Sequence, residues 1–127
     1  MLKELKELIE KAIEAKPRAR AMYSNFRVGA ALLTDNGLTF TGVNIECSSF
    51  GLTVCAERVA LFKAVSEGYL NFKRMAIVSD AKIFTPPCGA CRQVLYDYCP
   101  QLEIIMADSY RNVKIINLKE LYPLPFK

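Results

Sequence analysis

The residues best suited to chemistry are three cysteines, Cys55, Cys88 and Cys91, which lie where loops turn into predicted helices. Cys88 and Cys91 are three positions apart, so one helical face can present both sulfurs, and Cys55 can supply a third from another helix start. Free backbone N–H groups and the positive end of the helix dipole stabilise thiolates there. Three protein ligands with one open position are typical of catalytic zinc, whereas structural zinc normally has four. The spacing therefore predicts one catalytic Zn²⁺ per chain.

Glu57 and Arg58, which follow Cys55 closely, have the charges that such a site needs. Zinc lowers the pKa of its bound water to about 7, so hydroxide becomes available at neutral pH. Glu57 can shuttle protons only if the regular helix begins near Cys55, because an ideal helix would point the two side chains about 200° apart. Arg58 can offset the excess negative charge of three thiolates around one Zn²⁺. Gln93 could in turn hold Arg58 in place.

The chain contains no histidine. This absence excludes Ser-His and Cys-His nucleophile pairs, HExxH metal sites and imidazole acid/base catalysis. Catalysis near neutral pH must therefore depend on carboxylates, Cys, Lys, Tyr or a metal. A tight zinc site must be built from thiolates, with carboxylates as the remaining option.

Hydrophobic periodicity predicts an alternating α/β pattern that positions these residues. An amphipathic helix is expected over residues 2–15, closed before Pro17, and a hairpin turn is expected at Asp35-Asn36-Gly37. The predicted strands span 28–34, 39–43, 75–78, 103–107 and 113–116, and further helical segments span 54–67, 88–99 and 118–122. We expect a single domain over residues 1–127, a three-layer α/β/α fold with a mixed five-stranded sheet.

Composition limits the partners of this chain of 127 residues. The formal charge is +4, and only Lys16, Arg18 and Arg20 cluster, so we expect no binding of nucleic acid. No apolar run approaches the roughly 18 residues of a membrane span, and the charged N-terminus does not resemble a signal peptide. We therefore expect a cytoplasmic protein with no membrane contact. Its five cysteines should be reduced, Cys47 and Cys99 serving as packing residues.

Four motifs occur in order along the chain: Tyr23-Ser24-Asn25-Phe26-Arg27-Val28-Gly29-Ala30-Ala31, Asn44-Ile45-Glu46, Cys55-Ala56-Glu57-Arg58 and Pro87-Cys88-Gly89-Ala90-Cys91-Arg92-Gln93. With these motifs the chain resembles a known family, the small homotetrameric cytidine deaminases, in the variant where Cys replaces the first His ligand of zinc. The resemblance covers nearly the whole chain and implies the cytidine deaminase-like fold. It also implies hydrolysis of cytidine and 2′-deoxycytidine to uridine and 2′-deoxyuridine, with release of ammonia, in pyrimidine salvage.

The resemblance implies a role for each residue of the zinc site. Cys55, Cys88 and Cys91 hold the metal. In the mechanism described for zinc nucleobase deaminases, zinc-bound hydroxide attacks C4 of the base. Glu57 takes the proton from the zinc-bound water and delivers it to N3 and then to the leaving ammonia. The Ala56 backbone N–H helps to hold the base carbonyl.

Substrate contacts follow from the same resemblance. Phe26 packs on the base, and Asn44 and Glu46 bind the ribose hydroxyls. Phe126 reaches the active site of a neighbouring subunit in the homotetramer, and Phe50 is a second cross-subunit candidate. Phe50 stands where the family commonly has Tyr, so one hydrogen bond of the family is in doubt.

Four other functions remain open from the residues alone. Cys47 could complete a structural four-cysteine zinc module that catalyses nothing, or Cys88 and Cys91 could form the redox pair of a thiol oxidoreductase. Within the deaminases, the substrate could be a nucleic acid or a nucleoside antibiotic. The mild charge disfavours nucleic acid, and Asn44 and Glu46 favour a ribonucleoside.

Overall fold

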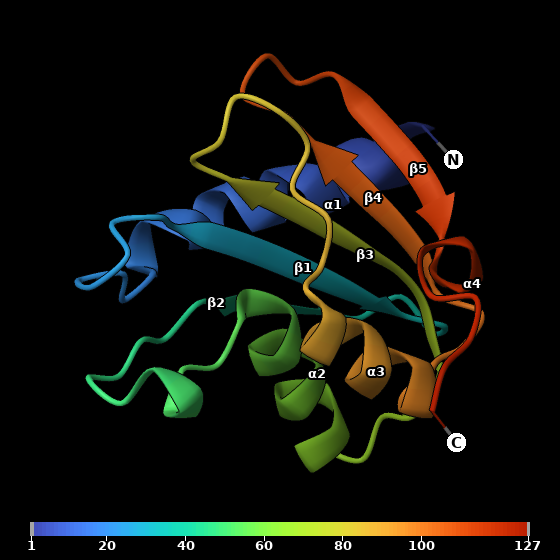
Figure 1. Ribbon diagram of the computed structural model, residues 1–127. Helices are drawn as coiled ribbons and strands as arrows, with labels where there is room; N and C mark the ends of the chain where they lie inside the picture. Colours follow the sequence, from blue (N-terminus) through green and yellow to red (C-terminus); the bar gives the residue numbers. More distant parts are fainter. Residues whose placement is uncertain (1, 127) are drawn as a thin grey trace.

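The computed structural model describes residues 2–126 (Figure 1). The chain begins with a helix, continues into a β-hairpin and then alternates helices with strands. The elements in order are α1 Leu2–Ala15, η1 Lys16–Arg18, β1 Val28–Thr34, β2 Thr39–Val43, η2 Phe50–Leu52, α2 Ala56–Ser66, β3 Phe72–Ser79, α3 Gly89–Tyr98, β4 Glu103–Ala107, β5 Val113–Asn117 and α4 Leu118–Leu121.

The strands form one sheet in the order β2-β1-β3-β4-β5. The β3–β4 pair is parallel, and the other three pairs are antiparallel. The hairpin turn predicted at Asp35-Asn36-Gly37 joins β1 to β2, with Gly37 at φ 91°. The predicted mixed five-stranded sheet is confirmed.

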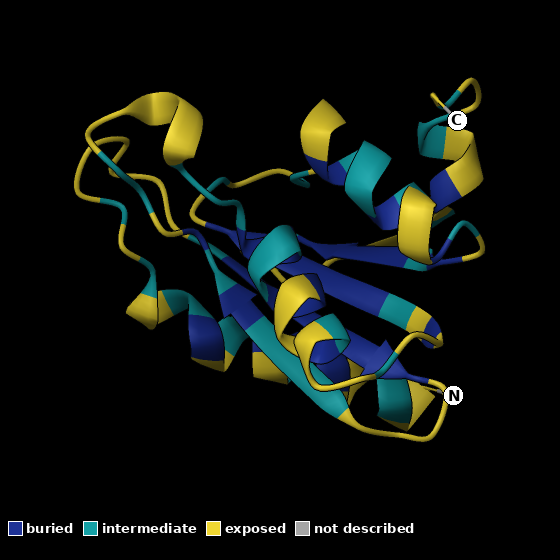
Figure 2. Ribbon diagram, turned by 90° about the horizontal axis from the view of Figure 1, so that it is seen from below, coloured by how far each residue is buried: buried dark blue, intermediate teal, exposed yellow. Residues whose placement is uncertain are grey.

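Helices cover both faces of the sheet, α1 on one side and α2 with α3 on the other (Figure 1). Alternate residues of β1 show this division: Ala31 and Leu33 pack with α1, whereas Ala30 and Leu32 pack with α2 and α3. Buried residues are therefore concentrated in the central strands between the helices (Figure 2). The three-layer α/β/α fold is confirmed. Among residues 2–126, no helix has both the length and the hydropathy that crossing a bilayer requires.

The helix starts differ slightly from the prediction, in a way that matters for the site. The helix expected over 54–67 begins at Ala56, because Cys55 has an extended backbone (φ −71°, ψ 156°). The helix expected over 88–99 likewise begins at Gly89, after an extended Cys88. Both cysteines are thus N-cap residues. The strand expected over 75–78 extends over Phe72–Ser79, since Phe72 and Arg74 near its start still pair with β1.

Candidate active site

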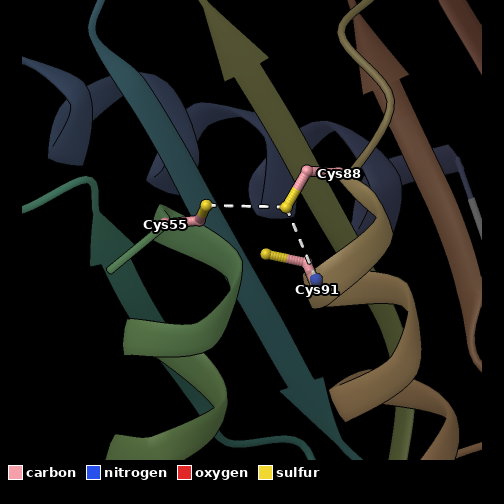
Figure 3. A group of neighbouring side chains, drawn as sticks. All are labelled: Cys55, Cys88 and Cys91. Atoms are coloured by element: carbon pink, nitrogen blue, oxygen red, sulfur yellow. Dashed lines mark hydrogen bonds between the residues drawn. The ribbon is translucent and has the colours of Figure 1, made fainter. Parts of the chain in front are cut away.

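Three thiols meet where the N-termini of α2 and α3 approach each other (Figure 3). The sulfurs of Cys55, Cys88 and Cys91 all lie within 4.8 Å of one another. Cys55 Sγ is 3.7 Å from Cys88 Sγ, and the backbone N–H of Cys91 donates to Cys88 Sγ over 3.5 Å. The structure therefore brings together the three ligands that the spacing predicted.

The helix starts give this cluster a positive environment. Cys55 and Cys88 immediately precede the first residues of their helices, where backbone N–H groups have no partner within the helix. One of these groups belongs to Ala56, a buried residue at the first position of α2. Thiolates are stabilised in such a position by the helix dipole and by the free donors.

Arg58 adds a full positive charge to the cluster. Its Nη2 lies 3.5 Å from Cys55 Sγ and 3.5 Å from the carbonyl oxygen of Thr53. Its Nε is buried without a hydrogen-bond partner among residues 2–126. The pKa of the Cys55 thiol is lowered to about 5, chiefly because Cys91 hydrogen-bonds to it and also because of Arg58. The pKa of Cys91 is raised, first by its hydrogen bond with Cys55 and then by burial.

This donor set fits a zinc ion. Three thiols so close together cannot all ionise easily without a cation between them, because each thiolate raises the pKa of the next. Soft sulfur ligands select zinc among the common divalent ions, and a site with three protein ligands leaves a coordination position for water or substrate. The guanidinium of Arg58 offsets the negative charge that three thiolates leave around Zn²⁺.

Glu57 lies beside the thiols, in the buried first turn of α2. Two residues that are two positions apart in an ideal helix point about 200° away from each other. Cys55 lies outside the helix, which begins at Ala56, so this angle does not apply and Glu57 can lie near Cys55. The pKa of Glu57 is raised to about 7, chiefly because burial penalises the charged carboxylate and further because of the Cys55 thiolate. A carboxyl group that changes its protonation state near neutral pH is suited to general acid/base catalysis.

The structure also brings together the three residues that the resemblance assigns to the nucleoside, Phe26 through its backbone. The side-chain amide of Asn44 donates to the carbonyl oxygen of Phe26 over 2.9 Å and to Glu46 Oε2 over 3.2 Å. Asn44 Oδ1 accepts from the backbone N–H of Val28 over 2.9 Å. The buried Asn44 thus joins the loop before β1 to the chain that follows β2.

A pocket of about 400 Å³ adjoins these residues, and its lining includes Glu46, Phe50 and Thr53. Thr53 connects the pocket to the thiols, because Arg58 bonds both its carbonyl oxygen and Cys55. Phe50 packs edge-on against Tyr23, with ring centroids 6.2 Å apart. A slightly larger hollow of about 440 Å³ lies on the opposite side of the sheet, where Lys and Glu side chains of α1 line it.

One predicted contact is wrong: Gln93 does not hold Arg58. Its side-chain oxygen accepts from the Tyr122 hydroxyl and from the backbone N–H of Phe126, and its nitrogen donates to the Phe126 carbonyl oxygen over 2.9 Å. The physical reason is the orientation of Gln93 around the axis of α3. Its side chain lies on the helix face that contacts the C-terminal segment, where it also bonds Asp97, four residues further along the same helix. The Phe126 side chain itself is largely exposed.

The remaining cysteines lie outside the thiol cluster. The group of possible metal ligands among residues 2–126 does not include Cys47, whose backbone N–H bonds Thr53 Oγ1 over 3.1 Å. Cys99 is buried in the core, and burial raises the pKa of its thiol to about 12. The burial of Cys99 agrees with the packing role expected from the sequence, whereas Cys47 is half-buried and its packing role remains a prediction.

Sequence reasoning missed the hydrogen-bond partners of Glu46. The backbone N–H groups of Tyr23 and Ser24 each donate to Glu46 Oε1 over 2.9 Å, and the Ser24 hydroxyl donates to Oε2. The pKa of Glu46 is lowered, chiefly by the hydrogen bond from the Ser24 side chain. The available signal was the place of Tyr23 and Ser24 in the first motif, which by itself does not identify their partner.

Comparisons with known proteins agree with this geometry. Residues 2–107 match the family model described as the cytidine and deoxycytidylate deaminase zinc-binding region. The cytidine deaminase of Halalkalibacterium halodurans is 47% identical over 120 residues, which cover 94% of this chain and 91% of that protein. The crystal structure of cytidine deaminase from Burkholderia pseudomallei superposes with a TM-score of 0.92 at 43% identity, covering 95% of this chain and 98% of the other.

A more distant relative has a different name. The blasticidin-S deaminase of Bacillus cereus is 33% identical over 130 residues, covering 94% of this chain and 90% of that protein. The family model supplies what the thiol geometry alone left open, since it describes a zinc-binding region over the residues that contain all three cysteines. The predicted zinc cofactor is therefore confirmed, and Cys55, Cys88 and Cys91 remain its predicted ligands.

Proposed function

Because the chain belongs to the cytidine and deoxycytidylate deaminase family, we propose that it hydrolyses the 4-amino group of cytidine and of 2′-deoxycytidine, with release of ammonia. The products are uridine and 2′-deoxyuridine, so the activity belongs to pyrimidine nucleoside salvage. The observation that carries the proposal is the buried carboxyl of Glu57 beside three thiols that are gathered at two helix starts.

Glu57 is the proton carrier in the proposed mechanism. Zinc, when bound by Cys55, Cys88 and Cys91, supplies a water molecule acidic enough to react at neutral pH. Glu57 accepts a proton from the attacking water and delivers it to N3 of the base. It then takes the proton of the hydroxyl group newly bound to C4 and passes it to the amino group, which leaves as ammonia while the C4 carbonyl forms. Its burial at the helix start keeps bulk water from competing for these transfers.

Base and sugar are bound by different parts of the pocket. Phe26, whose side chain is exposed, offers an aromatic face to the pyrimidine ring. The backbone N–H of Ala56, free at the start of α2, donates to the base carbonyl. Asn44 and Glu46 bind the sugar hydroxyls. This assignment is supported by the position of both residues, which belong to the hydrogen-bond network that also contains the backbone of Phe26.

We further propose that residues 1–127 form one deaminase domain that assembles as a homotetramer. Phe50, Leu52 and Phe126 are largely exposed, and apolar side chains of this size are commonly covered in assemblies. In the tetramer Phe126, and with it Phe50, reaches the active site of a neighbouring subunit. Light scattering during gel filtration tests the assembly, since a monomeric enzyme with full activity would contradict it.

A cytoplasmic location suits the metal site, because thiols stay reduced in that compartment. The five cysteines described here are all free, and three of them are needed for zinc. Oxidation of Cys55 with Cys88 would remove two ligands at once.

The rival functions are less well supported. A structural four-cysteine module needs Cys47 as a ligand, but Cys47 lies outside the group of thiols. A deaminase of nucleoside antibiotics shares the zinc chemistry, and the Bacillus cereus relative of that name is 33% identical, compared with 47% for the Halalkalibacterium halodurans cytidine deaminase. We therefore assign cytidine as the substrate.

The test is loss of cytidine absorbance on adding purified protein, with ammonia and zinc measured in parallel. The matched control is Glu57→Gln, which keeps the size of the side chain but cannot accept the proton. We expect turnover by the wild type and one zinc per chain in both proteins, with no turnover by the variant. A zinc-loaded wild type that leaves both cytidine and 2′-deoxycytidine unchanged would refute the substrate assignment.

A further inference from the structure

The carboxylate of Glu46 is surrounded by four hydrogen-bond donors. Oε1 accepts from the backbone N–H groups of Tyr23 and Ser24, each over 2.9 Å. Oε2 accepts from the Ser24 hydroxyl and, over 3.2 Å, from the side-chain amide of Asn44. The two backbone donors fix Oε1 and the Ser24 hydroxyl fixes one side of Oε2, so these bonds determine the orientation of the carboxylate. The longest bond, from Asn44, marks the position that a sugar hydroxyl can take.

Ser24 differs from the other donors, because its hydroxyl contacts both the Glu46 carboxylate and the backbone of Phe26. While it donates to Glu46, its oxygen also accepts from the backbone N–H of Phe26 over 3.1 Å. Asn25 lies between Ser24 and Phe26 with φ at 56°, a left-handed conformation that folds the loop back on itself. One hydroxyl thus links the proposed sugar-binding carboxylate to the backbone of the proposed base-binding ring.

The two oxygens of Glu46 are held unequally. Backbone groups hold Oε1, and no side-chain substitution removes them. The stronger hold on Oε2 is the Ser24 hydroxyl, since the remaining bond from Asn44 is longer, at 3.2 Å. Loss of the hydroxyl would let the carboxylate turn about its Oε1 anchor. Both Ser24 and Glu46 are exposed to the pocket, so water could then take the position of Oε2.

We propose that Ser24 is a positioning residue for sugar recognition: its hydroxyl fixes the Glu46 carboxylate in the orientation that accepts a nucleoside's sugar hydroxyl. The inference rests on the proposed function of Glu46. Ser24 thus influences the choice of substrate through Glu46, without touching the substrate itself. Nucleosides with sugar hydroxyls depend on Ser24, and nucleosides without them do not.

The experiment compares cytidine with 2′,3′-dideoxycytidine, which lacks the 2′ and 3′ hydroxyl groups of the sugar. We expect Ser24→Ala to raise the KM for cytidine about threefold to tenfold, the effect of losing one ordinary hydrogen bond, because Ser24 acts on the sugar only through Glu46. The KM for the dideoxy analogue, kcat for both substrates and zinc content should stay close to the wild-type values. Ser24→Thr retains the hydroxyl and should restore the KM for cytidine.

The outcomes separate this inference from the function on which it rests. Equal increases in KM for both substrates would mean that Ser24 only supports the loop, which overturns the inference, as would an increase that Ser24→Thr fails to reverse. Glu46→Ala serves as the reference variant. If Glu46→Ala abolishes discrimination between the substrates and Ser24→Ala leaves it intact, only the role of Ser24 is wrong. If Glu46→Ala leaves discrimination intact, the sugar-binding role of Glu46 fails, and the inference fails with it.

Discussion

The carbonyl oxygen of Ala56 lies where a side chain on Gly42 would begin. A Cβ atom on Gly42 would stand 2.3 Å from that oxygen and 2.5 Å from the backbone nitrogen of Ala60. Strand β2 and helix α2 are therefore in direct backbone contact. Because Ala56 lies between Cys55 and Glu57, this contact determines how far a metal ligand and the proposed proton carrier stand from the sheet.

Gly42→Ala should damage the active site as well as the fold. The added methyl group meets backbone rather than a flexible side chain, so α2 must move away from β2. Overpacking of this kind costs about 1–3 kcal/mol of the free energy of unfolding, and sometimes more. We expect the folded fraction of the variant to bind zinc more weakly, because Cys55 moves with α2. Urea unfolding and zinc content per folded chain measure the two effects.

Two other glycines provide the controls. A Cβ on Gly29 would stand 2.2 Å from the carbonyl oxygen of Ala12 in α1, on the face of the sheet opposite the thiols. Gly29→Ala should therefore lose stability but keep its zinc. Within residues 2–126, nothing lies within 4 Å of a Cβ on Gly51, so Gly51→Ala should leave stability and zinc content unchanged. If Gly29→Ala and Gly42→Ala lose equal amounts of zinc, the contact between Gly42 and α2 does not affect zinc binding more than a general loss of stability does.

The thiol cluster could be predicted from the sequence because its determinants are local. Cys88 and Cys91 are one helical turn apart, and the flanking residues show that helices begin beside Cys55 and Cys88. The contact of Gly42 with α2 could not be predicted from the sequence, because it depends on how a strand and a helix pack and leaves no periodic pattern in the residues. Gln93 was assigned to Arg58 for its closeness to the thiols in sequence, but the phase of α3 turns it toward the C-terminal segment.

A second prediction distinguishes catalytic from structural zinc. Cys47→Ser should keep one zinc per chain, because Cys47 is not in the thiol group. Cys88→Ser should lose most of the metal, since it removes one of three ligands. Zinc content after dialysis measures both, with Cys99→Ser as a control for a buried cysteine remote from the metal. Loss of zinc from the Cys47 variant would favour the four-cysteine structural module.

Acid should destabilise the protein partly through Asp80. Arg27 bonds this carboxylate with its Nε over 3.0 Å, and Lys16 lies 3.0 Å from it. These contacts, above all the hydrogen bond from Arg27, hold the pKa of Asp80 well below its usual range. A group whose pKa is lower in the folded state stabilises the fold above its unfolded-state pKa of about 3.9 and loses that contribution as the pH falls further.

Asp80→Asn removes this contribution at every pH. At pH 7 the variant should be less stable by about 1 kcal/mol, a modest value because the side chain is partly exposed and salt screens the pairs. The difference between wild type and variant should shrink steadily as the pH falls below about 4, because the unfolded state then binds a proton at Asp80 while the folded state does so only at still lower pH. Thermal melts across this range test the prediction, with Asp35→Asn in the exposed hairpin turn as control. A constant difference at all pH values would exclude the ion pairs as its cause.

Gln93→Ala should release the C-terminal segment while leaving the thiols in place. The side chain of Gln93 bonds both backbone groups of Phe126 and the Tyr122 hydroxyl, so its removal deletes three contacts at once. The local free energy of opening should fall by about 1–2 kcal/mol, seen as faster hydrogen exchange at the Phe126 amide. Gln101→Ala, a change at another exposed glutamine, controls for the substitution itself.

The same variant tests whether Gln93 acts through Phe126. If the aromatic ring of Phe126 completes a neighbouring site, Gln93→Ala and Phe126→Ala should each raise the KM for cytidine. The double variant should then be little worse than Phe126→Ala, because both changes remove one interaction. Additive effects would mean that Gln93 has a separate role. Loss of zinc from Gln93→Ala with unchanged exchange at Phe126 would restore the link between Gln93 and the thiols that the sequence first suggested.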